Sequence, residues 1–202
     1  MTPFITQNTF YHIKNLTLVV FLLLPVGCND KNEHPEAEVS TAQSSNGSQK
    51  AQTSDRYHII RKVSLSLPSG KLIDTKLAIT QQEQTIGLSG SKPESMTKYE
   101  GLLFFYLKDG SRQFWMPNTL FEIHIIFLDK NLKVIGIEKN VPYHPGRQEP
   151  PAIYRTRSYF ARHVLEIRAD SPLGEELELG TQLGWISKIS LLETESYIRQ
   201  PQ

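Results

Sequence analysis

Short stretches in which apolar and polar residues alternate recur along the chain, and turn residues separate them. In residues 57–67 the apolar side chains fall at every second position from Val63 onward, as in a strand with one buried face. A Pro-Ser-Gly turn at 68–70 leads to a second such stretch at 71–79. The two stretches and the turn between them predict a β-hairpin.

The densest apolar and aromatic block after the N-terminus lies at residues 101–129. Its runs at 102–107 and 122–127 are the length of strands and rich in phenylalanine and isoleucine, which favours buried strands over helices. A polar turn follows the second run, and residues 132–138 are predicted to return beside it.

Two short helices are predicted from capping signals. The first follows Thr80 and Glu83, which have the spacing of a capping box, and is expected to end near Leu88. The second opens at Ser171, has proline at its first helical position and is expected to end near Leu179. Further strands are predicted at 163–168 and 181–191. Together these elements predict a mainly β fold, a compact barrel-like antiparallel sheet with two short helices.

The N-terminal residues have the pattern of an exported protein. Residues 1–27 resemble a secretory signal peptide, with a lysine before an apolar segment that is too short to span a bilayer. The sequence Pro-Val-Gly precedes Cys28, as at the lipidated cysteine of bacterial lipoproteins. We therefore expect a lipid anchor at Cys28 that holds the protein on the bacterial cell envelope, facing the periplasm or the exterior. The alternative is an ordinary signal peptide or an uncleaved anchor.

Residues 28–55 are polar and contain almost no apolar side chains, which predicts a disordered tether. The expected organisation is a signal peptide at 1–27, a tether at 28–55, a globular domain at 56–192 and a C-terminal tail at 193–202.

Charge and cysteine content exclude several classes of function. The formal net charge of the 202 residues is +1, which indicates no general attraction to nucleic acid. The chain has 1 cysteine, so neither an intramolecular disulfide nor a cysteine-rich zinc site is expected. No motif predicts a cofactor, and membrane contact is expected only through the anchor at Cys28.

Several short motifs occur in the order of a known family. They are Gly-Leu at 87–88, Gly-Leu-Leu-Phe-Phe at 101–105, Phe-Trp-Met-Pro-Asn-Thr at 114–119 and Val-Leu-Glu at 164–166. With them the chain resembles the uncharacterised bacterial domain-of-unknown-function family number 192, over about residues 77–185. The resemblance implies a compact, mostly β, barrel-like domain that is often secreted or lipid-anchored, and it implies no agreed activity. Two positions differ from the family pattern: Ser89 where methionine is common, and His124 where aspartate is common.

The corner at Pro117 is the first candidate for a functional site. Proline has no N–H to donate to a neighbouring strand, so the strand pattern is expected to break there. Trp115, Asn118 and Thr119 could line a pocket, because they offer a stacking face together with hydrogen-bond donors and acceptors. They could equally be structural, with Trp115 in the core and the two polar side chains satisfying backbone groups at the corner.

The proline-rich segment 140–159 is the second candidate. It is predicted to be a long loop and is locally basic, with Arg147, Arg155 and Arg157. Arginine pairs well with carboxylate or phosphate, so Arg155 and Arg157 could bind an anionic ligand or a lipid headgroup. A solvated loop is the alternative.

Acid–base or metal chemistry has weaker support in the pattern. Glu166 could pair with Glu122 or His124 for catalysis, but nothing in the spacing brings these side chains together. The same holds for a metal site built from Glu166, His124, His144 and His163, and no metal site is predicted.

We therefore expect an envelope lipoprotein module that binds a small polar or anionic ligand or a protein partner. The expected site residues are Trp115, Asn118, Thr119, His124, Glu166, Arg155 and Arg157. The alternative is a hydrolase or other enzyme that acts on a cell-envelope polymer, and the sequence does not decide between the two.

Overall fold

In the computed structural model the described residues are 61–199. These residues form strands β1 (Lys62–Ser66), β2 (Leu72–Ala78), β3 (Glu100–Phe104), β4 (Gly110–Arg112), β5 (Ile123–Leu128), β6 (Val134–Val141), β7 (Tyr159–Ala161), β8 (His163–Arg168) and β9 (Gly184–Ile186). They also form the helices α2 (Gln81–Ile86) and α3 (Leu191–Arg199) and the 3-10 turns η1 (Pro93–Ser95) and η2 (Gly174–Glu176). The prediction of a mainly β domain with two short helices is confirmed.

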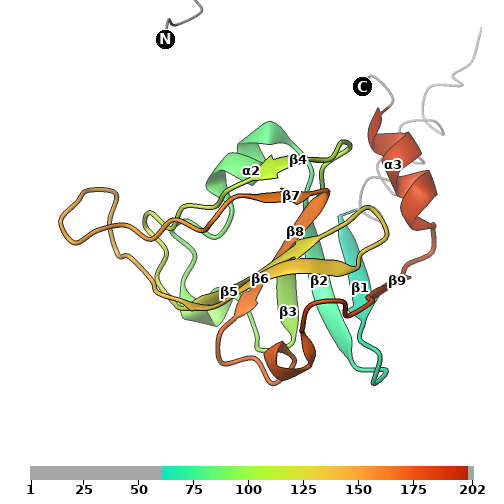
Figure 1. Ribbon diagram of the computed structural model, residues 1–202, viewed down its shortest axis with the longest axis horizontal. Helices are drawn as coiled ribbons and strands as arrows, with labels where there is room; N and C mark the ends of the chain where they lie inside the picture. Colours follow the sequence, from blue (N-terminus) through green and yellow to red (C-terminus); the bar gives the residue numbers. More distant parts are fainter. Residues whose placement is uncertain (1–60, 200–202) are drawn as a thin grey trace, which may run out of the picture. The chain divides into compact units, whose positions relative to one another are not determined.

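One 7-stranded sheet organises the domain, in the order β6-β5-β8-β3-β2-β1-β9, while β4 and β7 pair separately (Figure 1). The expected hairpins β1–β2 and β5–β6 are present. All neighbouring strands run antiparallel except β2 and β3, which are parallel. A parallel pair needs a connection that returns along the sheet, and α2 and η1 provide it between β2 and β3. The expected antiparallel sheet therefore contains one parallel pair.

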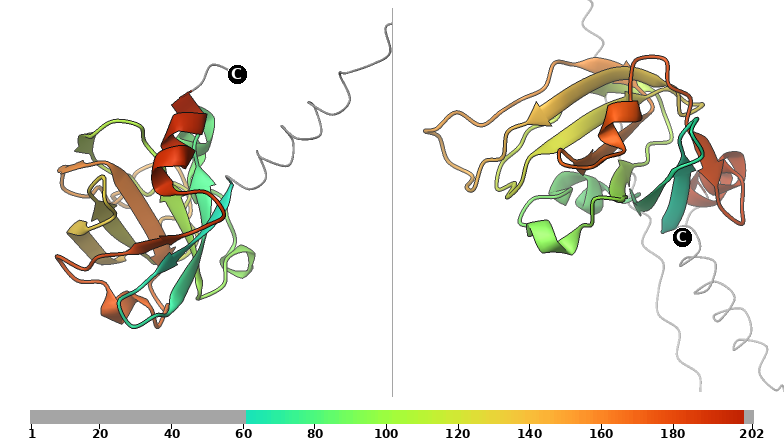
Figure 2. Two further views of the ribbon diagram at one scale, coloured as in Figure 1. Left: turned by 90° about the vertical axis from the view of Figure 1, so that its right-hand side faces the viewer. Right: turned by 90° about the horizontal axis from the view of Figure 1, so that it is seen from below.

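The sheet curls until its two ends meet (Figure 2). The Val134 N–H donates to the carbonyl of Thr181 at 2.9 Å, and the Gly180 N–H donates to the carbonyl of Val134 at 2.8 Å. The Leu183 N–H also donates to the carbonyl of Leu132 at 3.2 Å. These bonds join the start of β6 to the segment that leads into β9. The sheet is thus barrel-like, and the closure gives partners to backbone groups that an open edge would leave exposed.

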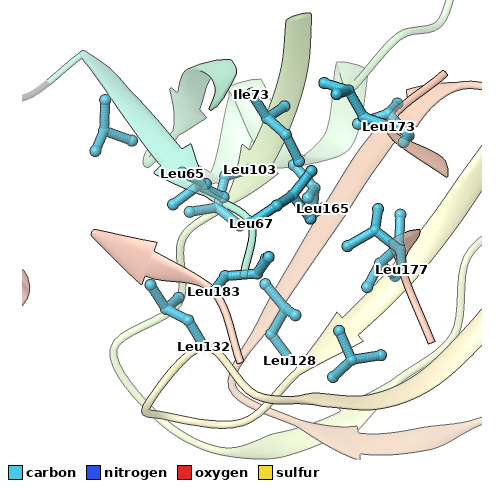
Figure 3. Close-up of a cluster of buried hydrophobic side chains, with 14 of the residues drawn as sticks. Leu65, Leu67, Ile73, Leu103, Leu128, Leu132, Leu165, Leu173, Leu177 and Leu183 are labelled. Carbon is cyan, nitrogen blue, oxygen red and sulfur yellow. The ribbon is translucent and has the colours of Figure 1, made fainter. Parts of the chain in front are cut away.

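The interior of the curled sheet is an apolar cluster to which strands from both halves contribute (Figure 3). Leu65, Ile73, Leu103 and Leu165 come from β1, β2, β3 and β8, and all four are fully buried. Each of these side chains points to the interior face of the sheet, and the residues directly before and after it in the strand point to the other face. This cluster gives a domain without a disulfide its apolar core.

The outer face of β3, β5 and β8 carries a second apolar cluster. The Phe104 ring meets the Phe114 ring edge-on at 4.7 Å, and the Phe127 ring stacks on Tyr159 at 4.1 Å. Phe114 and Tyr159 belong to the layer that covers this face. All positions of β5 are buried, so it is enclosed on both sides. This explains why its sequence is a continuous apolar run rather than an alternating one.

The capping box predicted for α2 is confirmed. Thr80 Oγ1 accepts the Glu83 N–H at 3.2 Å, and Glu83 Oε2 accepts the Thr80 N–H at 2.9 Å. Gln84 Nε2 donates to the carbonyls of Ala78 at 3.1 Å and Phe105 at 3.0 Å. No residue of α2 is buried. Polar contacts to the sheet, rather than an apolar face, therefore hold this helix in place.

The helix predicted from Ser171 is wrong. The segment forms only η2, although Ser171 Oγ accepts the Leu173 N–H at 3.3 Å as a cap would. Leu173 and Leu177 both enter the interior cluster, and a short turn is sufficient to place them there. The strand predicted at 181–191 is likewise confined to β9.

The last described helix, α3, spans the boundary that the sequence placed at residue 193. Its Tyr197 and Ile198 pack on the interior cluster, and Arg162 pairs with Glu195 at 2.9 Å. The helix is therefore part of the domain. It lies at one end of the curled sheet, and the loop between β6 and β7 lies at the other (Figures 1 and 2). No helix within residues 61–199 is long and apolar enough to cross a membrane.

Candidate functional site

Glu166 is the unusual residue of the outer face. It lies on β8 between β3 and β5, where its register partners are Leu102 and Ile125. The residue is 4% exposed, and its Oε2 atom has no hydrogen-bond partner among the described residues. A buried polar atom without a partner costs free energy, and the surroundings of this one are therefore informative.

Burial raises the pKa of the Glu166 carboxyl to about 8, because the charged form loses its hydration. At neutral pH the carboxyl is therefore mostly protonated and can donate a hydrogen bond. A cation that reached it would stabilise the charged form and oppose this shift. Burial also raises the pKa of the nearby Tyr106 hydroxyl; Arg112 opposes that rise and Glu166 adds to it.

Glu166 lines a pocket of ≈ 300 Å³ between α2, the turn that follows it and the segment 113–119. Most of the wall is aromatic or apolar, with Phe104, Tyr106, Phe114, Trp115, Met116 and Ile123. The polar side chains of the wall are those of Gln84, Thr85, Ser89, Gln113, Thr119, Arg147 and Glu166. Its volume is at the small end of the range for ligand sites, and the wall combines aromatic and apolar side chains with these polar groups.

Gly87 keeps the space beside the carboxyl open. It follows α2 with a φ of +51°, a conformation that favours glycine. A Cβ atom at this position would lie 2.9 Å from Cζ of Phe104 and 4.0 Å from Oε2 of Glu166. Any larger residue would therefore push into the aromatic wall next to Glu166.

The structure brings three of the predicted site residues together, since Trp115 and Thr119 line the same pocket as Glu166. Trp115 is 50% exposed, so it belongs to the rim rather than the core. The Arg155 guanidinium lies 5.2 Å from the centre of its ring. Thr119 is buried, and its carbonyl accepts the His144 N–H at 3.0 Å.

Asn118 does not line the pocket, and its main-chain groups hold the corner together. Its φ of +54° is in the left-handed region, which asparagine adopts more readily than most residues. Its carbonyl accepts the Gly90 N–H at 2.7 Å, and its own N–H donates to the carbonyl of Gly146. Asn118 thus ties together three segments that surround the pocket.

His124 lies on the opposite face of the sheet from Glu166. In the register of β5 and β8 it faces Ile167, whereas Glu166 faces Ile125. His124 Nδ1 accepts the Asn140 N–H at 3.0 Å. Burial lowers the pKa of His124, and the charge of nearby Lys139 lowers it further. The two side chains cannot act on one substrate atom.

The other two histidines within residues 61–199 also lie apart from Glu166. Both ring nitrogens of His144 contact carbonyls of its own loop, those of Gly146 at 2.9 Å and Pro151 at 3.0 Å. His163 faces the interior, where its ring lies 4.5 Å from that of Phe105. Within residues 61–199 no group of three His, Cys, Asp or Glu side chains is placed to hold a metal ion.

The basic residues of the loop between β6 and β7 fall into two groups. Arg155 pairs with Glu149 at 3.1 Å, and Arg157 pairs with Glu138 at 3.3 Å. Neither lines the pocket. Arg147 does line it and has no ion pair with any described residue. The arginine placed at the pocket is therefore not one of the two that the sequence favoured.

Sequence reasoning missed several other pocket residues, namely Gln84, Gly87, Phe104, Tyr106, Gln113 and Phe114. Gly87, Phe104 and Phe114 belong to motifs that carried the family resemblance, so a signal for them was present. No pattern in the sequence indicated that the end of α2 lies over β8. Cys28, where the sequence predicts a lipid anchor, lies outside the described residues.

Comparison with known proteins gives a family and two solved structures. One is a crystal structure from Sinorhizobium meliloti 1021 titled "putative transcription regulator". It is 24% identical and covers 61% of this chain and 92% of its own, with a TM-score of 0.49. The other, a protein of unknown function from Novosphingobium aromaticivorans DSM 12444, is 25% identical and covers 61% of this chain and 84% of its own, with a TM-score of 0.49. No curated protein matches.

The family comparison covers most of the described domain. The matching model is that of DUF192, described as "Uncharacterized ACR", and the match extends over residues 65–185. These residues run from the last two residues of β1 to the first two of β9, and they include every residue that lines the Glu166 pocket. This chain therefore belongs to the DUF192 family.

Proposed function

We propose that the protein is a ligand-binding module of the bacterial cell envelope and that the Glu166 pocket is its binding site. One observation carries the proposal: the Oε2 atom of Glu166 is buried, has no partner among the described residues and lines a pocket large enough for a small molecule. A ligand that donates a hydrogen bond to this atom would remove the cost of leaving it unpaired.

Binding fits the arrangement better than catalysis. General acid–base catalysis needs an acid and a base within reach of one substrate atom. Glu166 is the only acidic residue among those that line the pocket, and no histidine lines it. His124 faces the other side of the sheet, and Glu122 is exposed and directly precedes β5. The pocket lining thus gives the hydrolase alternative no second carboxylate and no histidine beside Glu166.

The proposal is tested by a screen of small polar compounds (amino acids, amides, sugars and carboxylates) against the full chain. Binding is read by thermal shift and by Trp115 fluorescence in a Trp185→Phe background. We expect Glu166→Gln to weaken any bound compound by about tenfold or more, because a charged or strong hydrogen bond is lost. Glu178→Gln, an exposed acid away from the pocket, is the matched control.

Two results would contradict the proposal. Compounds that bind Glu166→Gln as tightly as the wild type would have their site elsewhere. A complete absence of binding, with Trp115→Ala of near-native stability, would favour a protein partner at the exposed Trp115.

We also propose that Cys28 carries the lipid anchor and holds the domain at the envelope. The proposal rests on the signal-like residues 1–27 and on the position of the chain's 1 cysteine directly after them. Metabolic labelling with a fatty-acid analogue tests it: the wild type should be labelled and fractionate with membranes, and Cys28→Ser should not. Stable anchoring needs more than one acyl chain. Unlabelled mature protein in the soluble fraction would contradict it.

A further inference from the structure

The Glu166 pocket has a different charge at each of its two ends. Glu166 is 4% exposed and marks the closed end, whereas Arg147 is exposed and marks the mouth. The side chains between them are mostly apolar or aromatic, among them Phe104, Phe114 and Ile123. A ligand that fills the pocket therefore meets an acid at its inner end, an apolar middle and a cation at its outer end.

Arg147 differs from the arginines that follow it. Arg155, Arg157, Arg162 and Arg168 each pair with a carboxylate. Arg147 has no such partner within residues 61–199, and its contact with Ser89 Oγ is 3.5 Å long, at the limit of a hydrogen bond. Its guanidinium is thus available to a carboxylate or phosphate, which it can bind through two parallel hydrogen bonds.

At the other end of the pocket, the carboxyl of Glu166 is the group that a cation would pair with. Its Oε2 atom lacks a partner among the described residues, and the residue lines the pocket together with Gly87 and Phe104. The charged or titratable side chains of the pocket besides Glu166 are Tyr106 and Arg147, with Arg112 lying 3.6 Å from the centre of the Tyr106 ring. None of the lining residues is a lysine, so no ammonium group of the wall can pair with the carboxyl.

We infer that the pocket takes a compact zwitterion, whose amine or guanidine end reaches Glu166 and whose carboxylate end meets Arg147. This inference rests on the proposed function, because it names the class of ligand for the same site. A cationic end would hold Glu166 as a carboxylate, since the opposite charge offsets the loss of hydration. The volume of ≈ 300 Å³ restricts the ligand to the size of a single amino acid or a short ω-amino acid.

The inference is tested with a series of probes that differ only in their charged ends. The zwitterions are γ-aminobutyrate, δ-aminovalerate, ε-aminocaproate, lysine and arginine. The single-ended relatives are butylamine, valerate and caproate. Isothermal titration of the full chain should show at least one zwitterion that binds about tenfold or more tightly than the relative lacking either end, because both charged contacts are then made.

Variants assign each end to its residue. Glu166→Gln should remove the preference for the zwitterion over the matching carboxylate, and Arg147→Gln should remove its preference over the matching amine. Lys130→Gln, an exposed cation at the turn between β5 and β6, is the control for charge and should leave both preferences unchanged. Arg147 and Lys130 are both on the surface, so these two variants are expected to fold even where Glu166→Gln loses stability.

The outcomes separate this inference from the proposed function. Binding of uncharged sugars or amides that depends on Glu166, with no preference for zwitterions, would overturn the inference and leave the pocket as a ligand site. Equal binding of valerate and δ-aminovalerate, unaffected by Glu166→Gln, would also overturn it. If no compound of either screen binds, both the inference and the proposed function fail.

Discussion

The two faces of β8 bury one titratable side chain each, in different surroundings. His163 faces the interior, where its Nδ1 accepts the Tyr106 N–H at 3.3 Å and its ring lies 4.5 Å from Phe105. Glu166 faces outward, where its Oε2 has no partner and lines the pocket. The His163 Nε2 atom also lacks a partner among the described residues.

Burial keeps both groups neutral near pH 7. It lowers the pKa of His163 to about 3, assisted by the charge of Arg162, and raises the pKa of Glu166 to about 8. Both side chains therefore cost stability through the same loss of hydration. The comparison teaches that burial of a titratable group does not by itself indicate a site. Glu166 is the functional candidate because it lines a pocket, whereas His163 packs in the interior cluster.

The largest expected effect concerns the pH dependence that Glu166 imposes. Its pKa is about 8 in the folded state against 4.5 for the unperturbed group, so between these values the folded state binds more protons. The free energy of unfolding should therefore fall as the pH rises from 4.5 to about 8, by about 5 kcal/mol for this group alone. Urea unfolding of the wild type and Glu166→Gln across this range should show the stability of the wild type falling relative to that of the variant, because the opposing contribution of His163 is common to both. Parallel curves would refute the raised pKa.

His163 should act with the opposite sign on the acid side. Its pKa is about 3 when folded and 6.5 when unperturbed, so the unfolded state binds more protons in between. Stability from this group should be lost as the pH falls from 6.5 towards 3, by up to about 5 kcal/mol. His163→Gln should lack this loss in acid titrations followed by circular dichroism. An equal acid sensitivity in the variant would assign the loss to other groups.

A pair of truncations should separate the interior from the pocket rim. Leu165 is fully buried beside Glu166 in the sequence but on the interior face, and Leu165→Ala should cost about 2–5 kcal/mol through the cavity that it leaves. Trp115 is 50% exposed, so Trp115→Ala should cost less than about 1 kcal/mol despite its larger side chain. Denaturant unfolding of both variants measures the difference. A larger cost for Trp115→Ala would indicate that the Trp115 side chain is part of the core.

Gly87→Ala should combine a moderate loss of stability with a blocked pocket. The backbone strain at a φ of +51° is expected to cost about 1–3 kcal/mol, and the added methyl would meet the Phe104 ring. Thermal unfolding and a titration with whichever probe the wild type binds should show both effects. Ser91→Ala, directly after the same turn and outside the pocket lining, controls for a general loosening of this segment. Unchanged binding in Gly87→Ala would place the ligand elsewhere.

The smallest expected effect is at the start of α2. Thr80→Ala removes the side-chain acceptor of the capping box and should cost about 1 kcal/mol. Since α2 forms part of the pocket wall but Thr80 does not line the pocket, ligand binding should be retained in the folded variant. The midpoint of urea unfolding measures the loss, and an unchanged midpoint would show that the cap contributes little.

The sequence by itself determined the features that depend on neighbouring residues. The hairpins β1–β2 and β5–β6 followed from alternation and turn chemistry, and the capping box of α2 followed from Thr80 and Glu83. Trp115 and Thr119 were also identified as candidate pocket residues from their local pattern. Such signals lie within a few residues of one another, so a single chain displays them in full.

Only the tertiary structure decided which distant residues meet. The parallel pairing of β2 with β3, the approach of Gly87 to Glu166 and the position of Arg147 at the pocket each join segments far apart in the chain. The helix predicted from Ser171 was replaced by η2 because the interior needed only Leu173 and Leu177 from that segment. Strand alternation shows that Glu166 and His163 lie on opposite faces of β8. It does not show which of the two faces is covered by a pocket, because that depends on distant segments.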